Sequence, residues 1–233
     1  MTAPLPVATL PDVTTAQMRE IDRVMIEDLG ISLVQMMENA GRSLADLAML
    51  VAPSTSPSSC VVLAGPGGNG GGGLVAARHL ANRGIDVEVV LAAPDRLAEV
   101  PRRQLGILER MGVPIVEEPG EAELVIDAVI GYGVEGDPRG RAGELIAWAN
   151  ARHGFVLSLD GPSGLDLTTG RIGQPCVLAD ATMTLAAPKR GLRLAPGVVG
   201  TLYAADISVP PGVFVDLELR IEPFAHGPIV RVR

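Results

Sequence analysis

The sequence is poor in the residues that recognise nucleic acids or build disulfide frameworks. Aromatic residues make up 3% of its 233 positions, and the formal net charge is −8. Base stacking and binding to a phosphate backbone are therefore not expected, because they need aromatic platforms and a basic surface. Only two cysteines are present, Cys60 within an apolar run and Cys176 in a predicted loop, so the sequence favours a reducing compartment.

Long apolar runs and targeting segments are missing as well. No apolar stretch reaches the roughly 18 residues that span a membrane. The segment 1–11 has no basic region followed by an apolar core, so no signal peptide is predicted. The three histidines are scattered and have no metal-ligand spacing, and Lys189 is the only lysine. These absences favour a cytoplasmic protein without a cysteine or histidine metal centre.

What the sequence does contain is an alternation of strand-like and helix-like segments. Two capping boxes, Thr14 with Gln17 and Ser32 with Gln35, predict two helices before the first strand, and the first should end at Gly30. Apolar, β-branched runs then alternate with segments of helical periodicity. The predicted strands cover 60–64, 86–91, 124–130, 155–160, 182–185 and 201–205, with helices at 74–81, 102–111 and 142–151 and a further strand of unknown position within 213–219.

This alternation predicts an α/β fold. Strands joined by helices pair in parallel through right-handed crossovers, which gives a doubly wound, mostly parallel sheet in three αβα layers. With 47% hydrophobic residues the chain can form one core, so we expect a single domain over 1–233 with an ordered core at about 13–210. Ligands of such sheets bind at the carboxyl ends of the strands.

The sequence is dominated by one glycine segment, residues 65–73, with seven glycines in nine positions. It follows a predicted strand and precedes a predicted helix, so a loop with free N–H groups that cradles a phosphate is one interpretation. A flexible turn without a ligand is the other. The match to G-x-G-x-x-G is weak in so glycine-rich a stretch. Asn69 either presents its carbonyl oxygen to a ligand or is a left-handed turn residue.

Polar residues at the predicted strand ends offer further candidates, each with a structural alternative. Asp127 lies in an apolar strand, where a carboxylate needs a partner or a cation, although it could cap the following turn. Asp160 ends another strand and could act as a general acid or base, or form an Asx turn. Ser163 follows in Pro162-Ser163-Gly164, which is not a nucleophile elbow. Lys189 could meet a phosphate or lie in a surface turn.

Several ordered motifs together resemble the YjeF N-terminal domain family, the NAD(P)HX epimerases, over about residues 13 to 210. The similarity includes the glycine segment with the helix that follows it and the Asp127-Ala128 pair. The other matching motifs are Thr15-Ala16-Gln17-Met18 with Asp22, Met37-Glu38-Asn39-Ala40-Gly41, Asp160-x-Pro162-Ser163-Gly164-Leu165-Asp166 with Gly170, and Ala187-Pro188-Lys189-x-Gly191-Leu192.

The resemblance implies a Rossmann-like fold, a homodimer, and interconversion of the R and S hydrates of damaged NADH and NADPH. It implies a potassium ion, one per subunit, bound by Asn69, Asp127 and Ser163, whose oxygens suit a hard cation. It also implies a catalytic Asp160 and substrate contacts at Gly68, Asn69, Gly70, Gly71 and Gly72, at Gly131, Tyr132, Gly133, Val134, Glu135, Gly136 and Asp137, and at Asp160.

A chemical hypothesis follows for these residues. The C6 hydroxyl of the hydrated nicotinamide would leave with the help of a proton, the ring nitrogen would donate its lone pair to give an iminium, and water would return to the other face. Asp160 is the candidate that stabilises the cation and moves the proton. Since 233 residues leave no room for the kinase-type dehydratase fused to this domain in some relatives, a separate NAD(P)HX dehydratase is the expected pathway partner.

The sequence departs from the family pattern in the glycine segment. The family usually has Gly-Asn-Asn-Gly-Gly-Asp-Gly, whereas Gly68 stands here for the first Asn and Gly72 for the Asp; Gly161 replaces a common aliphatic residue. The alternative hypothesis is therefore a nucleotide-binding or scaffold member with impaired catalysis. A Rossmann-like enzyme acting on another nucleotide or a sugar phosphate is a third.

Overall fold

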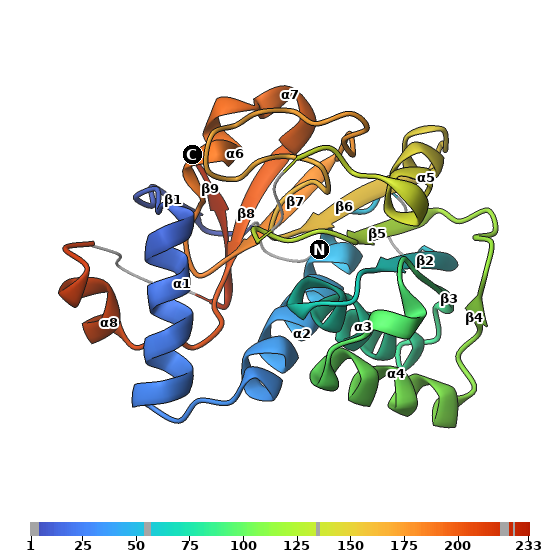
Figure 1. The fold of residues 1–233 in the computed structure, drawn as a ribbon, viewed down its shortest axis with the longest axis horizontal. Coiled ribbons are helices and arrows are strands. Elements are labelled where there is room, and N and C mark those ends of the chain that lie inside the picture. The colour runs from blue at the N-terminus through green and yellow to red at the C-terminus, as the bar shows by residue number, and fades with distance from the viewer. Residues whose placement is uncertain (1–4, 54–56, 134–135, 220–223, 226) are drawn as a thin grey trace.

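The protein folds around one nine-stranded sheet, seen in a computed structural model that describes residues 5–53, 57–133, 136–219, 224–225 and 227–233 (Figure 1). The order across the sheet is β1-β9-β8-β7-β6-β5-β2-β3-β4, and every neighbouring pair is parallel except β8 with β9. The strands are β1 (Val7–Ala8), β2 (Ser59–Ala64), β3 (Asp86–Leu91), β4 (Ile115–Val116), β5 (Leu124–Ala128), β6 (Phe155–Leu159), β7 (Ala181–Leu185), β8 (Thr201–Ala205) and β9 (Ile229–Val232).

Helices cover both faces of the sheet, so the predicted three-layer α/β fold is confirmed. In Figure 1, α2, α3 and α4 lie on one side of the sheet, and α5, α6 and α7 lie on the other. The helical segments are α1 (Thr15–Arg23), the π-helix η1 (Val24–Asp28), α2 (Leu33–Val51), α3 (Gly68–Ala81), the 3-10 turn η2 (Pro94–Arg96), α4 (Glu99–Met111), α5 (Gly140–Asn150), α6 (Arg190–Leu194), α7 (Pro196–Val199) and α8 (Pro211–Asp216).

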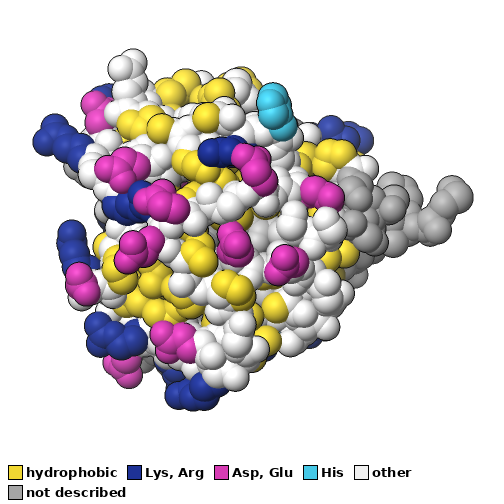
Figure 2. Space-filling model, turned by 90° about the vertical axis from the view of Figure 1, so that its right-hand side faces the viewer, with side chains coloured by type: hydrophobic (Ala, Val, Ile, Leu, Met, Phe, Trp, Pro, Cys, Tyr) yellow, Lys and Arg dark blue, Asp and Glu magenta, His cyan; other side chains and the backbone are white. Residues whose placement is uncertain are grey.

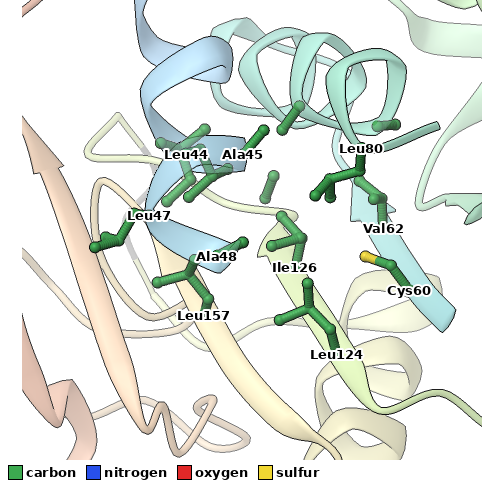
Figure 3. Close-up of a cluster of buried hydrophobic side chains, with 14 of the residues drawn as sticks. Leu44, Ala45, Leu47, Ala48, Cys60, Val62, Leu80, Leu124, Ile126 and Leu157 are labelled. Atoms are coloured by element: carbon green, nitrogen blue, oxygen red, sulfur yellow. The ribbon is translucent and has the colours of Figure 1, made fainter. Parts of the chain in front are cut away.

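The core is divided by the sheet because successive side chains of a strand point to opposite faces. Val62 of β2, Ile126 of β5 and Leu157 of β6 pack against Leu44 of α2 and Leu80 of α3 (Figure 3). On the other face, a second cluster joins alternate strand residues to α5. Both faces of the central strands are thus buried, which explains why their sequences are continuously apolar.

The two N-terminal helices begin as predicted. Both capping boxes are present: the hydroxyls of Thr14 and Ser32 accept the N3 amide hydrogens, and the side chains of Gln17 and Gln35 accept the N-cap amide hydrogens. The first helix continues as the π-turn η1 and ends before Gly30, whose φ of 69° lies in the left-handed region that favours glycine.

The glycine segment is different from its prediction as a loop, because α3 already begins at Gly68. The glycines allow this helix to pack unusually closely. A Cβ on Gly73 would lie 2.6 Å from the Ala128 Cβ of β5, and one on Gly70 would overlap the Gly65 carbonyl oxygen. In the facing helix α2, a Cβ on Gly41 would lie 2.6 Å from the Gly72 oxygen. Close packing on two sides therefore accounts for much of the glycine content.

The C-terminal segment also corrects a prediction. The alternating residues within 213–219 do not form a strand; they lie mostly in α8, which begins with Pro211 at its first position and buries Val213 and Phe214. The strand near this end of the chain is β9, whose residues Ile229–Val232 pair with β8 and with β1. The sheet thus extends beyond the last strand recognised in the sequence.

Candidate active site

A pocket of about 560 Å³ opens at the carboxyl ends of β2, β5, β6 and β7. It contains the point where the chain order reverses, since β2 continues to β3 on one side and pairs with β5 on the other, and doubly wound sheets bind ligands at such points. Helices α1 and α2 form its remaining walls. The lining residues are Met18, Arg19, Asp22, Leu33, Met36, Met37, Ala40, Pro66, Gly67, Gly68, Asn69, Gly72, Val129, Ile130, Gly131, Tyr132, Gly133, Leu159, Asp160, Leu185, Lys189 and Ile207.

The glycine segment forms one wall of this pocket with only part of its length. Gly68, Asn69 and Gly72 line the pocket, whereas Gly70 and Gly71 are buried in helix packing and do not. The N-cap Gly67 has an extended backbone and provides no side-chain cap, so the first N–H groups of α3 are not satisfied by a capping side chain. This wall therefore offers N–H donors and the positive end of a helix dipole.

The segment after β5 is brought to the pocket in part. Gly131, Tyr132 and Gly133 line it. Gly136 and Asp137 do not, and Asp137 instead accepts a hydrogen bond of 2.7 Å from Arg171. The predicted contacts Val134 and Glu135 lie outside the described residues.

Asp160 follows β6 and faces the pocket from a strained backbone position. Its φ is 65°, in the left-handed region that non-glycine residues adopt at an energetic cost, and such strain clusters at functional sites. Its Oδ1 accepts hydrogen bonds from Lys189 Nζ, from Thr184 Oγ1 at 3.3 Å and from the Leu185 amide at 3.3 Å. Among the described residues nothing donates to Oδ2, which leaves that oxygen available to a ligand.

Lys189 is the cationic partner of Asp160. Only 1% of its surface is exposed, and its ammonium also donates to the Leu185 carbonyl at 2.9 Å. The surface-turn interpretation of this lysine is therefore wrong. A buried carboxylate beside a buried ammonium gives the pocket a fixed pair of charges in a low-dielectric wall.

Asp127 lies behind the pocket wall rather than in it. It is fully buried, and both it and Ser163 are absent from the pocket lining. Its carboxylate accepts from Ser163 Oγ at 2.5 Å, from the Ser163 amide and Ser158 Oγ at 2.8 Å each, and from the Val129 amide at 3.3 Å. Burial raises the pKa of Asp127, and these hydrogen bonds partly oppose the rise.

The residues around Asp127 have the chemistry of an oxygen site for a hard cation. All hydrogen-bond donors to Asp127 within the described segments are neutral, so its charge has no ionic partner there. Ser163 Oγ also accepts from the amide of Ile130, which lines the pocket. On the pocket side, the Asn69 Nδ2 is buried without a partner. Because amide rotation exchanges nitrogen for oxygen, Asn69 can offer an oxygen in this position.

Other metals fit the pocket less well. No group of three or more histidine, cysteine, aspartate or glutamate residues is arranged to hold a metal within the described parts of the chain. Both cysteines are free and buried, and burial raises the pKa of their thiols, so they remain protonated. Carboxylate, hydroxyl and amide oxygens are the ligands of a hard cation rather than of a soft metal.

Some pocket-lining residues were given no role in the predicted site, although Asp22 and Met37 belong to the motifs that carry the family resemblance. Asp22 of α1 lines the pocket and accepts a hydrogen bond from the Tyr132 hydroxyl. One further signal was available: Asp22 follows Met18 by four residues and precedes Met25 by three, so it places a carboxylate beside the buried stripe of the helix. The apolar wall from α2, formed by Met36 and Met37, is visible only once the helix is placed over the strand ends.

Comparison with protein families shows to which family the chain belongs. The model of the YjeF-related protein N-terminus matches residues 33–191. The chain belongs to this family. The match includes the glycine segment, Asp127, Asp160 and Lys189, but it begins after α1.

Curated relatives extend the similarity over most of the chain. A Dehalogenimonas lykanthroporepellens protein named NAD(P)H-hydrate epimerase is 46% identical over 227 residues, which cover 94% of this chain and 92% of the relative. A Hyperthermus butylicus protein named bifunctional NAD(P)H-hydrate repair enzyme Nnr is 40% identical over 213 residues, 84% of this chain. That match covers only 39% of the bifunctional protein.

A solved structure shows the same fold. The crystal structure of yeast ynu0 superposes with a TM-score of 0.84 and covers 95% of this chain and 100% of the yeast chain, at 23% identity. The chain described here therefore has the same overall fold as the yeast protein.

Proposed function

We propose that this chain is an NAD(P)H-hydrate epimerase, which interconverts the R and S hydrates of NADH and NADPH and so repairs damaged nicotinamide nucleotides. The observation that carries this conclusion is the relative of that name, which matches over nearly the full length of both chains at 46% identity. The pocket supports it, because its charged Asp160 and apolar walls suit a reaction that passes through a cationic ring.

The reaction inverts C6 of the hydrated nicotinamide. The lone pair of the ring nitrogen expels the protonated C6 hydroxyl as water and leaves an iminium; water then adds to the opposite face and loses a proton. We assign to Asp160 the stabilisation of the iminium and the movement of a proton, since its Oδ2 accepts no hydrogen bond from the described residues. Lys189 and Thr184 hold the other oxygen and thereby fix the carboxylate in place.

Substrate binding is assigned to the surrounding walls. The N–H groups at the start of α3, around Gly68 and Asn69, are suited to a phosphate of the dinucleotide. Tyr132 and the glycines beside it form the facing wall, and the methionines of α2 offer an apolar surface for a ring. These assignments rest on the lining of the pocket and on the chemistry of each group.

A potassium ion is proposed at Asn69, Asp127 and Ser163. Its support is the fully buried carboxylate with only neutral donors among the described residues, together with the unpartnered Asn69 amide. When bound, the ion would supply a positive charge beside the pocket wall and offset the charge of Asp127. Asn69 would connect this site to the start of α3.

Assembly and location are further proposals. None of the helices within the described segments is long and apolar enough to cross a membrane. A cytoplasmic location is supported by two buried cysteines that form no disulfide. A homodimer is supported by the exposed apolar side chains of Ile26 and Leu29, which a second copy could cover. The bifunctional relatives support a separate NAD(P)HX dehydratase as the pathway partner here.

Impaired catalysis, the alternative suggested by Gly68 and Gly72, has no observation in its favour among the relatives reported. A coupled assay tests the function directly. The purified protein is mixed with R-NADHX and an S-specific dehydratase, and loss of the R form is followed. The proposed function predicts an accelerated loss that depends on enzyme concentration. Nucleotide binding without acceleration would support a scaffold role instead.

A further inference from the structure

Asp22 is a second carboxyl group in the pocket, and like Lys189 it lies next to Tyr132. It comes from α1, whereas Asp160 comes from the end of β6. The Tyr132 hydroxyl donates to Asp22 Oδ2, and the Tyr132 ring lies 5.9 Å from the Lys189 ammonium. The described residues therefore place Asp22, Tyr132, Lys189 and Asp160 in one contiguous series within the pocket.

The two carboxyl groups have different partners. Asp160 contacts the buried ammonium of Lys189, whereas the hydrogen bond given to Asp22 comes from the neutral Tyr132. The charged and titratable groups that face Asp22 are Tyr132 from the segment after β5, Lys189 from the segment after β7, and Asp160. Arg19 lies on the same helix as Asp22, and its charge lowers the pKa of Tyr132. The α2 wall offers only apolar side chains to the pocket.

The surroundings of Asp22 favour its protonated form more than water does. Burial raises the pKa of Asp22; the Tyr132 hydrogen bond and the Lys189 charge lower it, and the Asp160 charge raises it, so that the pKa stays above its ordinary value. Burial and the contact with Asp22 raise the pKa of Tyr132 too, so its hydroxyl remains a donor. Asp22 thus keeps its proton to a higher pH than an exposed aspartate does.

Inversion at C6 requires both an acid and a base. The leaving hydroxyl needs a proton, and the water that adds to the other face must lose one. One carboxylate that is held beside an ammonium is well suited to stabilise the iminium, but in that state it has no proton to give. A carboxylic acid with a raised pKa in the same pocket would supply this proton. Other enzymes also use the surroundings of two carboxyl groups to give them different pKa values and different roles.

We propose that Asp22 is a second catalytic residue, the general acid that protonates the departing C6 hydroxyl, while Asp160 acts as the base toward the incoming water. This inference rests on the proposed epimerase function. The Asp22 proton moves to the C6 oxygen, the C6–O bond breaks with its electron pair on that oxygen, and the nitrogen lone pair forms the C6–N double bond. Water adds to the opposite face of C6, the π pair returns to nitrogen, and Asp160 takes the proton.

After one inversion the proton has passed from Asp22 to Asp160. The state with Asp160 protonated and Asp22 ionised inverts the S hydrate in the reverse direction, and proton exchange with solvent water restores the starting state. No oxidant, reductant or further co-reactant is consumed.

The test uses Asp22→Asn, Tyr132→Phe and the control Asp28→Asn, an exposed aspartate at the end of η1 that is bonded to Arg23. The pH dependence of kcat and KM is measured for R-NADHX. Asp22→Asn should lower kcat by about 100- to 1,000-fold with KM changed by only a few-fold, because general acid catalysis contributes about this much. It should also abolish the alkaline fall in rate. Asp28→Asn should match the wild type.

Tyr132→Phe tests the same role without removing the carboxyl group. The hydroxyl lowers the pKa of Asp22 by donating to its charged form, so its loss should move the alkaline limb of the rate profile to higher pH. A purely structural role would change the rate at all pH values and leave the limb in place. This variant decides the question if Asp22→Asn does not fold, as judged by thermal melting.

Three results would overturn the role of Asp22: a wild-type kcat in Asp22→Asn, a lowered kcat with an unchanged alkaline limb, or an unmoved limb in Tyr132→Phe. Failure of the wild-type protein to epimerise R-NADHX would overturn the proposed function as well. If the wild type is active and Asp22→Asn is equally active, only the proposed role of Asp22 is overturned and the epimerase function stands.

Discussion

Substitutions in the ion pair of Asp160 and Lys189 distinguish the contribution of Asp160 to catalysis from its contribution to the free energy of unfolding. Asp160→Asn leaves the Lys189 ammonium, which is 1% exposed, without its carboxylate. Removing one partner of a buried pair costs about 3–5 kcal/mol. Lys189 keeps its hydrogen bond to the Leu185 carbonyl at 2.9 Å and the one to Thr184 at 3.3 Å, so we expect a loss near the lower end of that range, about 3 kcal/mol.

The double variant Asp160→Asn with Lys189→Met removes both charges and keeps a chain of similar volume. Replacement of a buried pair by uncharged groups is often neutral, so the double variant should be more stable than Asp160→Asn alone, yet remain inactive. Urea unfolding at pH 7 measures both changes. Glu121→Gln, which breaks a surface pair with Arg152, is the control and should change the free energy of unfolding by less than about 1 kcal/mol.

Three results would refute this reasoning. An Asp160→Asn protein as stable as the wild type would mean that the ammonium is not held in a low-dielectric environment. A double variant less stable than Asp160→Asn would mean that the two charges are not coupled. Recovered epimerase activity in the double variant would show that Asp160 is not a catalytic residue.

Two further predictions concern the glycine segment and the proposed cation. Gly73→Ala should destabilise the protein by about 1–3 kcal/mol in urea unfolding, because the new Cβ would lie 2.6 Å from the Ala128 Cβ. Gly106→Ala, whose Cβ would meet only the end of the Arg110 side chain, should stabilise the protein by roughly 1 kcal/mol. A stabilising Gly73→Ala with a destabilising Gly106→Ala would contradict the explanation by close packing. Potassium chloride should raise the melting temperature above that in choline chloride of equal ionic strength, and Asp127→Asn should abolish the difference; equal melting temperatures of the wild type in the two salts would argue against the ion.

Much of the fold was predictable because its signals are local or continuous. The buried strands β2, β5 and β6 are apolar along their length, and the capping boxes at Thr14 and Ser32 act within a few residues. On the face seen in Figure 2, acidic and basic side chains are interspersed among apolar ones.

The start of α3 could not be read from local propensity, because glycine disfavours helices. Tertiary packing overrides that preference: Gly70 and Gly73 lie where the backbone of Gly65 and the side chain of Ala128 leave no room for a Cβ. The alternation of apolar and polar residues within 213–219 is typical of a strand. Val215 is nevertheless 68% exposed, so the apolar residues do not all lie on one buried face.

The candidate site was predictable in its parts and not in its pairings. Asp160 and Asn69 could be identified from their positions after predicted strands. The partner of Asp160 is Lys189, 29 residues along the chain, and the donor to Asp22 is Tyr132, 110 residues along it. Such pairs depend on which strands lie side by side and on where α1 crosses the strand ends, and neither is encoded in local spacing.

The central claim, that the C6 hydroxyl leaves and water returns to the opposite face, is tested most directly by epimerising R-NADHX in ¹⁸O-labelled water. The S product is analysed by mass spectrometry at early times, with Asp160→Asn as the control for uncatalysed exchange. The account predicts that the S hydrate formed by the enzyme carries ¹⁸O at C6 and that the label fails to appear above background with the variant. Rapid formation of unlabelled S hydrate by the wild-type enzyme would contradict it.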